Sequence, residues 1–132
     1  MVLLMNKSQI SKILEKIPDD VPIEFYFTDR FSVLENTADI EKINIEYNPN
    51  GINNIKFEFT GYFMSDVSIT INTGEFRKIL ESKFITDESL IVGTDNYSDY
   101  PLERIDISYT NSGYKVRLHL KEEVVNERNS AA

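Results

Sequence analysis

Two short loops in the sequence carry side chains that could bind cationic groups. In each loop a Thr-Asp pair is followed by an aromatic residue and a serine: Thr28, Asp29, Phe31 and Ser32, then Thr94, Asp95, Tyr97 and Ser98. An ionised carboxylate accepts paired hydrogen bonds from a guanidinium group, and an aromatic ring adds contact area at little cost in conformational entropy. The pattern therefore predicts a surface that binds basic side chains of another protein.

Further acidic and aromatic residues lie near both loops in the sequence. We predict a partner-binding surface made of Asp29, Phe31, Glu35, Asp39, Asp95, Tyr97, Asp99 and Tyr100. A competing interpretation is local, because aspartates commonly close Asx-turns and aromatic residues commonly enter the core. In that interpretation Asp29 and Asp95 cap turns, while Phe31 and Tyr97 are core residues. Both interpretations fit the sequence.

Side chains that usually carry catalysis are few. The chain has no cysteine, which excludes thiol chemistry, disulfides and cysteine-based zinc sites. Its one histidine, His119, shares a face with Lys115, Arg117 and Lys121 in an alternating run, which predicts a solvated imidazole. The sequence has neither a glycine-rich phosphate loop nor a nucleophile elbow. We expect a protein that is not an enzyme and needs no cofactor or metal ion.

The charge balance favours one class of partner. The 132 residues include 22 acidic and 14 basic side chains, for a net charge of −8. Nucleic-acid binding requires lysine and arginine to displace phosphate counterions, so we expect no direct contact with nucleic acid. A basic protein partner, reached by electrostatic steering, fits better. The alternative is that the acidity serves solubility alone.

The start of the chain predicts neither export nor membrane insertion. Its apolar run, MVLLM, is five residues long. A signal peptide needs a longer apolar region, and a membrane-spanning helix needs about 20 apolar residues. We therefore expect a cytoplasmic protein without a membrane partner, and homo-oligomerisation remains open.

The elements that must position the two loops occur twice in the sequence. KILEK begins at Lys12 and KILES at Lys78, 66 residues later. IEKINIEYNPNG begins at Ile40 and LERIDISYTNSG at Leu102, 62 residues later. Together with the two Thr-Asp loops, these strings keep their order, which indicates an internal duplication.

Each copy predicts a helix at its start. Asn6 with Gln9, and Asn72 with Glu75, have the spacing of a capping box. Apolar residues then recur at helical spacing in both copies. A strand follows each helix, PIEFYF in the first copy and SLIVG in the second.

Each copy also predicts a β-hairpin. Apolar and polar residues alternate over 43–47 and 105–109, and glycine-containing turns follow. The expected registers place Lys42 opposite Glu58 and Asp106 opposite Arg117, so that opposite charges pair on the solvated face.

These elements predict an α+β protein built by internal duplication of an αβββ unit (helix, strand, β-hairpin), with an extra strand between the copies and antiparallel sheets. The first repeat spans 6–60, the connecting strand 61–71, the second repeat 72–121 and a polar tail 122–132. No linker rich in Pro, Gly or Ser separates the copies, so we expect them to pack as one compact unit with a shared core.

The second copy resembles a known family. The run LIVGTDNYSDYPLERIDISYTNSGYKVRLHL is similar to the αβββ segment of a small acidic phage anti-CRISPR inhibitor family that acts on type II effector nucleases. The similarity lies in a strand ending in GTD, a nearby serine, an alternating hairpin and a turn carrying Asn and Gly. The resemblance implies a DNA mimic whose carboxylates occupy the site where arginines of the nuclease read the protospacer-adjacent motif. It implies that Asp95 and Asp29 supply these carboxylates.

From the composition and the resemblance we expect a non-enzymatic acidic protein that binds and inhibits a basic, nucleic-acid-binding protein in the host cytosol, such as a CRISPR effector nuclease. One alternative is an immunity protein that neutralises a cognate toxin nuclease. Another is a structural or oligomerising accessory protein whose acidity is incidental, and a hydrolase comes last. An inhibitor should gather its carboxylates on one face, whereas a structural protein should expose an apolar patch.

Overall fold

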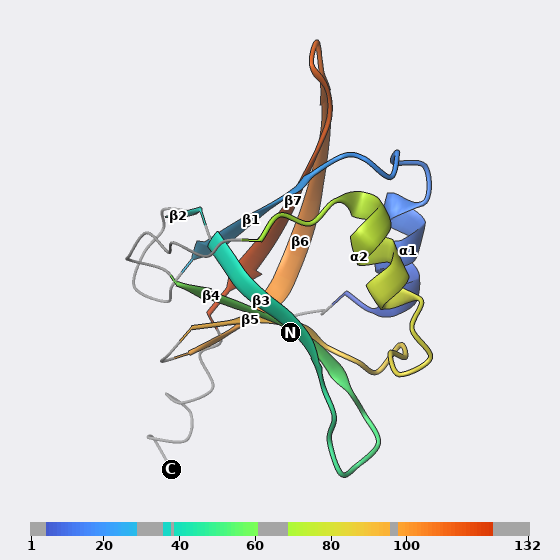
Figure 1. The fold of residues 1–132 in the computed structure, drawn as a ribbon, viewed down its shortest axis with the longest axis vertical. Coiled ribbons are helices and arrows are strands. Elements are labelled where there is room, and N and C mark those ends of the chain that lie inside the picture. Colours follow the sequence, from blue (N-terminus) through green and yellow to red (C-terminus); the bar gives the residue numbers. More distant parts are fainter. Residues whose placement is uncertain (1–4, 29–35, 38, 61–68, 96–97, 123–132) are drawn as a thin grey trace.

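The computed structural model describes residues 5–28, 36–37, 39–60, 69–95 and 98–122 (Figure 1). These residues form two helices and seven strands: α1 (Lys7–Leu14), β1 (Ile23–Thr28), β2 (Asn36–Thr37), β3 (Asp39–Glu46), β4 (Asn54–Thr60), α2 (Thr73–Leu80), β5 (Ile91–Thr94), β6 (Asp99–Thr110) and β7 (Gly113–Lys121). The predicted α+β class is confirmed. Neither described helix is long and apolar enough to cross a membrane.

The strands form one mixed sheet in the order β2-β1-β7-β6-β5-β4-β3. β1 runs parallel to β7 and β4 runs parallel to β5, whereas the remaining pairs are antiparallel. The prediction of antiparallel sheets is therefore wrong. The return strand of each hairpin lies beside the single strand of the other half of the chain. Parallel neighbours require a crossover connection, and α2 lies in the crossover between β4 and β5.

Both helices begin at the predicted capping boxes. The side chains of Asn6 and Asn72 accept hydrogen bonds from the backbone N–H groups of Gln9 and Glu75, and the return bonds are also present. The two helices lie side by side over one face of the sheet (Figure 1). Arg77 of α2 joins them, because its Nη2 donates to the carbonyl oxygen of Leu14, the last residue of α1, at 2.6 Å and to that of Ile17, beyond the helix, at 2.7 Å. The guanidinium thus gives a partner to a carbonyl group at the end of α1, where carbonyl groups have no intrahelical partner.

An aromatic cluster holds the sheet in a curled shape. Three strands separate β1 from β4 in the sheet order. Even so, the ring centroids of Phe25 and Phe57 are 4.8 Å apart, and those of Phe27 and Phe59 are 5.0 Å apart. The sheet must therefore bend until its flanks face each other across the core. Burial of one such ring is worth about 1.5–3 kcal/mol.

Residues 69–71, the described part of the segment between β4 and α2, contact both flanks of the curled sheet. Of the predicted range 61–71, only Ile69–Ile71 lies within the described residues, and these three are not in a strand. The N–H of Ile69 donates to the carbonyl of Ile40 in β3 at 2.8 Å. The carbonyl of Ile71 accepts from the N–H of Ile23 in β1 at 2.9 Å. The segment therefore contacts both flanks of the curled sheet.

The two halves share local details, although β2 of the first half has no counterpart among the described residues of the second. Both helices have eight residues, and both hairpins shift register at matching places, between Ile40 and Lys42 and between Leu102 and Arg104. The predicted registers, Lys42 opposite Glu58 and Asp106 opposite Arg117, are confirmed. The β3–β4 and β6–β7 hairpins project from the body in opposite directions (Figure 1).

Gly93 in β5 provides a test of the packing in this core. A β-carbon at position 93 would lie 2.5 Å from Cδ1 of Leu120 and 2.9 Å from Cε1 of Phe59. We expect Gly93→Ala to lower the free energy of unfolding by about 1–3 kcal/mol, because both neighbours must move. Urea unfolding measures this, with Ser108→Ala on the exposed part of β6 as the control. Equal unfolding midpoints for the two variants would contradict close packing at Gly93.

Candidate functional site

An acidic depression lies on the face of the sheet that points away from the helices. It has a volume of about 380 Å³ and is formed by β3, β4 and the end of β5. Its lining residues are Glu41, Asn44, Glu46, Lys56, Glu58, Phe59, Thr94 and Asp95. Four carboxylates thus surround one ammonium group. This arrangement suits a positively charged side chain of a partner, because a guanidinium is less strongly hydrated than an ammonium and pairs with carboxylates in a fixed geometry.

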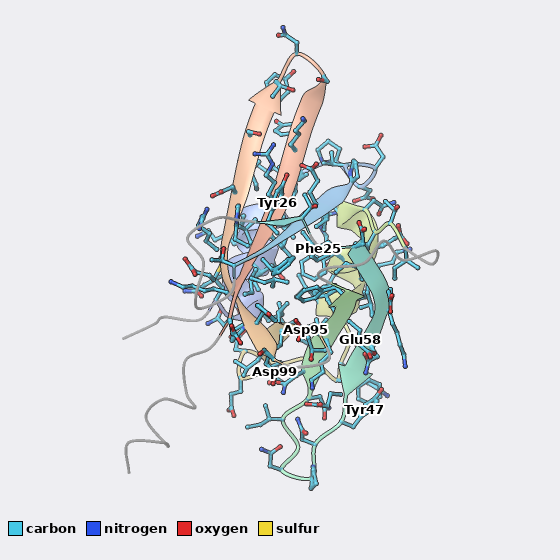
Figure 2. All side chains as sticks on the ribbon, turned by 90° about the vertical axis from the view of Figure 1, so that its left-hand side faces the viewer. Phe25, Tyr26, Tyr47, Glu58, Asp95 and Asp99 are labelled. Atoms are coloured by element: carbon cyan, nitrogen blue, oxygen red, sulfur yellow. The ribbon has the colours of Figure 1, made fainter. Side chains whose placement is uncertain are left out.

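Strand pairing extends the acidic depression toward β6. Glu58 lies opposite Thr94 in the parallel β4–β5 pair, and Thr94 lies opposite Asp99 in the antiparallel β5–β6 pair. Paired residues point to the same face of a sheet, so these three side chains form one row. Figure 2 shows Glu58, Asp95 and Asp99 on the same side of the molecule. Asp99 is exposed and adds a further negative charge beside the depression.

Lys56 balances part of this charge. Its Nζ is 2.8 Å from Oε2 of Glu46. The hydrogen bond that Lys56 donates to Glu46, with the charges of Glu46, Asp99 and Glu58, raises the pKa of Lys56 above 10.5, although desolvation opposes the rise. The same hydrogen bond lowers the pKa of Glu46 below 4.5. Both groups are therefore charged at neutral pH, and the depression keeps a net negative charge.

Asp95 closes a turn, as the local interpretation of the sequence predicted. Its Oδ1 accepts the backbone N–H of Ser98 at 2.7 Å, and its Oδ2 accepts the hydroxyl of Tyr100 at 3.0 Å. The same carboxylate lines the acidic depression. Asp95 therefore has a structural role whether or not a partner contacts it.

Tyr100 is a core residue, and its prediction as part of a partner-binding surface is wrong. Its exposed fraction is 4%, and its ring lies 5.7 Å from that of Phe27 and 5.3 Å from that of Phe59. The cause is the alternation of β6, in which Tyr100 and Leu102 face the core while Asp99 faces outward.

The other predicted site residues divide into two groups. Asp39 is exposed at the start of β3, opposite Thr60, and does not line the acidic depression. Four predicted residues lie outside the described residues: Asp29, Phe31, Glu35 and Tyr97. The structure thus brings together Asp95 and Asp99 from the predicted set.

Three further carboxylates of the depression, those of Glu41, Glu46 and Glu58, were not predicted as site residues. A signal for two of them was present in the sequence. The alternation that predicted the β3–β4 hairpin places Glu46 and Glu58 on its solvated face. Glu41 lies at the register shift after Ile40, where alternation no longer fixes the face.

His119 is buried, so the prediction of a solvated imidazole is wrong. Its exposed fraction is 7%, its ring stacks on Tyr26 with centroids 5.5 Å apart, and its Nε2 is 2.7 Å from Oδ2 of Asp106. Parallel pairing of β1 with β7 places Tyr26 beside His119. On the same face, Nε of Arg117 lies 3.2 Å from Oε1 of Glu24. Asp106 also lies near Arg104, with Arg104 Nε and Asp106 Oδ2 3.4 Å apart, so the acidic groups on this part of the sheet have arginine partners.

No group of three or more His, Cys, Asp or Glu side chains in the described part of the chain is arranged to hold a metal ion. Comparison of the chain with protein-family models, curated proteins and solved structures gives no match.

The Asp95 turn can be tested by removing its carboxylate. We expect Asp95→Ala to cost about 1–3 kcal/mol in the free energy of unfolding, because Ser98 and Tyr100 lose an acceptor in a partly buried turn. Thermal and urea unfolding measure the loss. Asp99→Ala, at an exposed neighbour, should stay within about 0.5 kcal/mol of the parent protein. Similar losses in both variants would argue against the turn.

The ion pair between Glu46 and Lys56 predicts a pH dependence. The pKa of Glu46 is lower in the folded protein, so its contribution is present above the unfolded pKa and is lost as pH falls through the folded pKa. We expect Glu46→Gln to cost up to about 1 kcal/mol at pH 7, as for partly exposed pairs. The cost should vanish well below pH 4.5. Urea unfolding at pH 7 and in acid tests this, and a pH-independent difference would contradict it.

Proposed function

We propose that the protein is a non-enzymatic acidic protein that binds and blocks a basic, nucleic-acid-binding surface of another protein. The observation that carries this proposal is the acidic depression, with Asp99 at its border. Arginine and lysine side chains that bind phosphate groups also bind carboxylates, and arginine does so with two parallel hydrogen bonds. A surface with spaced carboxylates can therefore compete with nucleic acid for the same basic site.

The distribution of charge supports a directed surface instead of general acidity. On β1, β6 and β7 acidic residues lie beside arginines, as in the pairs of Glu24 with Arg117 and of Asp106 with Arg104. Across the acidic depression the carboxylates outnumber the bases. Electrostatic attraction therefore steers a basic partner toward the acidic depression.

A more specific form of the proposal names the partner as a type II CRISPR effector nuclease and the origin as a phage. The resemblance of the second half to the anti-CRISPR family supports it, since the GTD motif ends with Asp95 at the acidic depression. The same chemistry suits an immunity protein that blocks a toxin nuclease. We also propose that the halves arose by duplication of an αβββ unit, supported by the matching capping boxes and register shifts.

DNA cleavage by a guide-loaded type II effector, with the protein in excess, tests the specific form. We expect inhibition that weakens with added salt, because salt screens exposed charges. The double variant Glu58→Lys/Asp99→Lys should lose at least tenfold in inhibition. The matched control, Glu15→Lys/Glu81→Lys, reverses two exposed charges at the ends of the helices and should inhibit like the parent protein.

A capture experiment tests the broader form. The parent protein and both double variants are immobilised and exposed to host lysate at low and high salt. We expect basic nucleic-acid-binding proteins to bind the parent and the control but not the Glu58→Lys/Asp99→Lys variant. Equal capture by all three proteins would overturn the role of the acidic depression. Capture of a toxin nuclease without any CRISPR effector would replace the specific form with the immunity function.

A further inference from the structure

The two ends of the sheet are covered to different extents. At one end, β2 pairs with β1, and the N–H of Ile23 donates to the carbonyl of Ile71. At the other end lies β3, whose outer edge receives one backbone hydrogen bond among the described residues, from Ile69 to Ile40. From Lys42 to Glu46 the described structure places no further strand beside β3. An open edge of this kind can pair with another strand.

We propose that β3 pairs with β3 of a second copy, antiparallel, about a twofold axis through Asn44. In this register Lys42 lies opposite Glu46 of the second copy, and Ile43 lies opposite Ile45 of the second copy. Asn44 meets its own equivalent on the axis. The two sheets then become one continuous sheet across the dimer.

The charges of β3 select this register. Lys42, Asn44 and Glu46 face outward, whereas Ile43 and Ile45 are half-buried against the core. Only an axis through a residue keeps outward side chains opposite outward ones. An axis through Lys42 or Glu46 would oppose like charges, which destabilises a strand pair. An axis through Ile43 or Ile45 would place a charged side chain opposite Asn44. The axis through Asn44 is the one that gives both ion pairs.

One further feature of β3 agrees with this pairing. A lysine in an edge strand opposes nonspecific pairing, so Lys42 restricts association to partners with a carboxylate in register.

This inference goes beyond the proposed function and does not require a basic partner. Asn44 and Glu46 line the acidic depression, so the dimer brings two depressions next to each other on one outer face. The combined surface would be larger and twofold symmetric.

A single cysteine tests the twofold axis directly, because the chain has no cysteine of its own. Directly opposite residues in an antiparallel pair have Cα atoms about 4.5–5.5 Å apart, within the range that a disulfide spans. We expect Asn44→Cys to form a covalent dimer rapidly under mild oxidation at micromolar concentration. Glu58→Cys, on the neighbouring strand β4 and on the same outer face, is the control and should remain monomeric.

Sedimentation of charge variants provides the second test. We expect the parent protein to show a concentration-dependent monomer–dimer equilibrium. Lys42→Glu and Glu46→Lys should each weaken the dimer at least tenfold, because each places like charges opposite each other. An equimolar mixture of the two variants should form heterodimers, because positions 42 and 46 then carry opposite charges across the interface. Circular dichroism verifies that each variant is folded. A parent protein that stays monomeric at millimolar concentration, or equal cross-linking of both cysteine variants, would overturn the proposal.

Discussion

The contact between the two flanks of the curled sheet is the constraint on which the rest of the structure depends. Phe27 on β1 packs against Phe59 on β4 and Tyr100 on β6, although these strands are not neighbours of β1. Burial of these rings favours a bent sheet, and the bend leaves room for a pair of helices over the inner face. The outer face must then carry the polar residues of every strand, and the acidic depression forms where carboxylates from β3, β4 and the end of β5 collect on it.

Exchange of strands between the halves explains how so small a chain builds this core. β1 pairs with β7 and β5 pairs with β4, so each half supplies a neighbour to the single strand of the other. Neither half keeps these backbone hydrogen bonds when it is alone. The halves are therefore expected to fold together, and stability cannot be divided between them residue by residue.

Features that depend on nearby residues could be predicted from the sequence, whereas features that depend on distant strands could not. The capping boxes and hairpin registers were correct because three-residue spacing and alternation are local properties. His119 was misplaced because β1, more than 90 residues earlier in the chain, covers it. The parallel pairs escaped prediction for the same reason, and the acidic depression combines side chains from three strands whose order alternation does not reveal.

Gly93 shows why the two halves cannot be interchanged. It follows Phe27 by 66 residues, the same spacing that separates the two helices. Phe59 contacts the ring of Phe27 and also occupies the space beside Gly93. The ring of Phe59 therefore fits between Phe27 and Gly93 only because position 93 carries no side chain. A chain that repeated the first half, with phenylalanine at position 93, would place two rings where one fits.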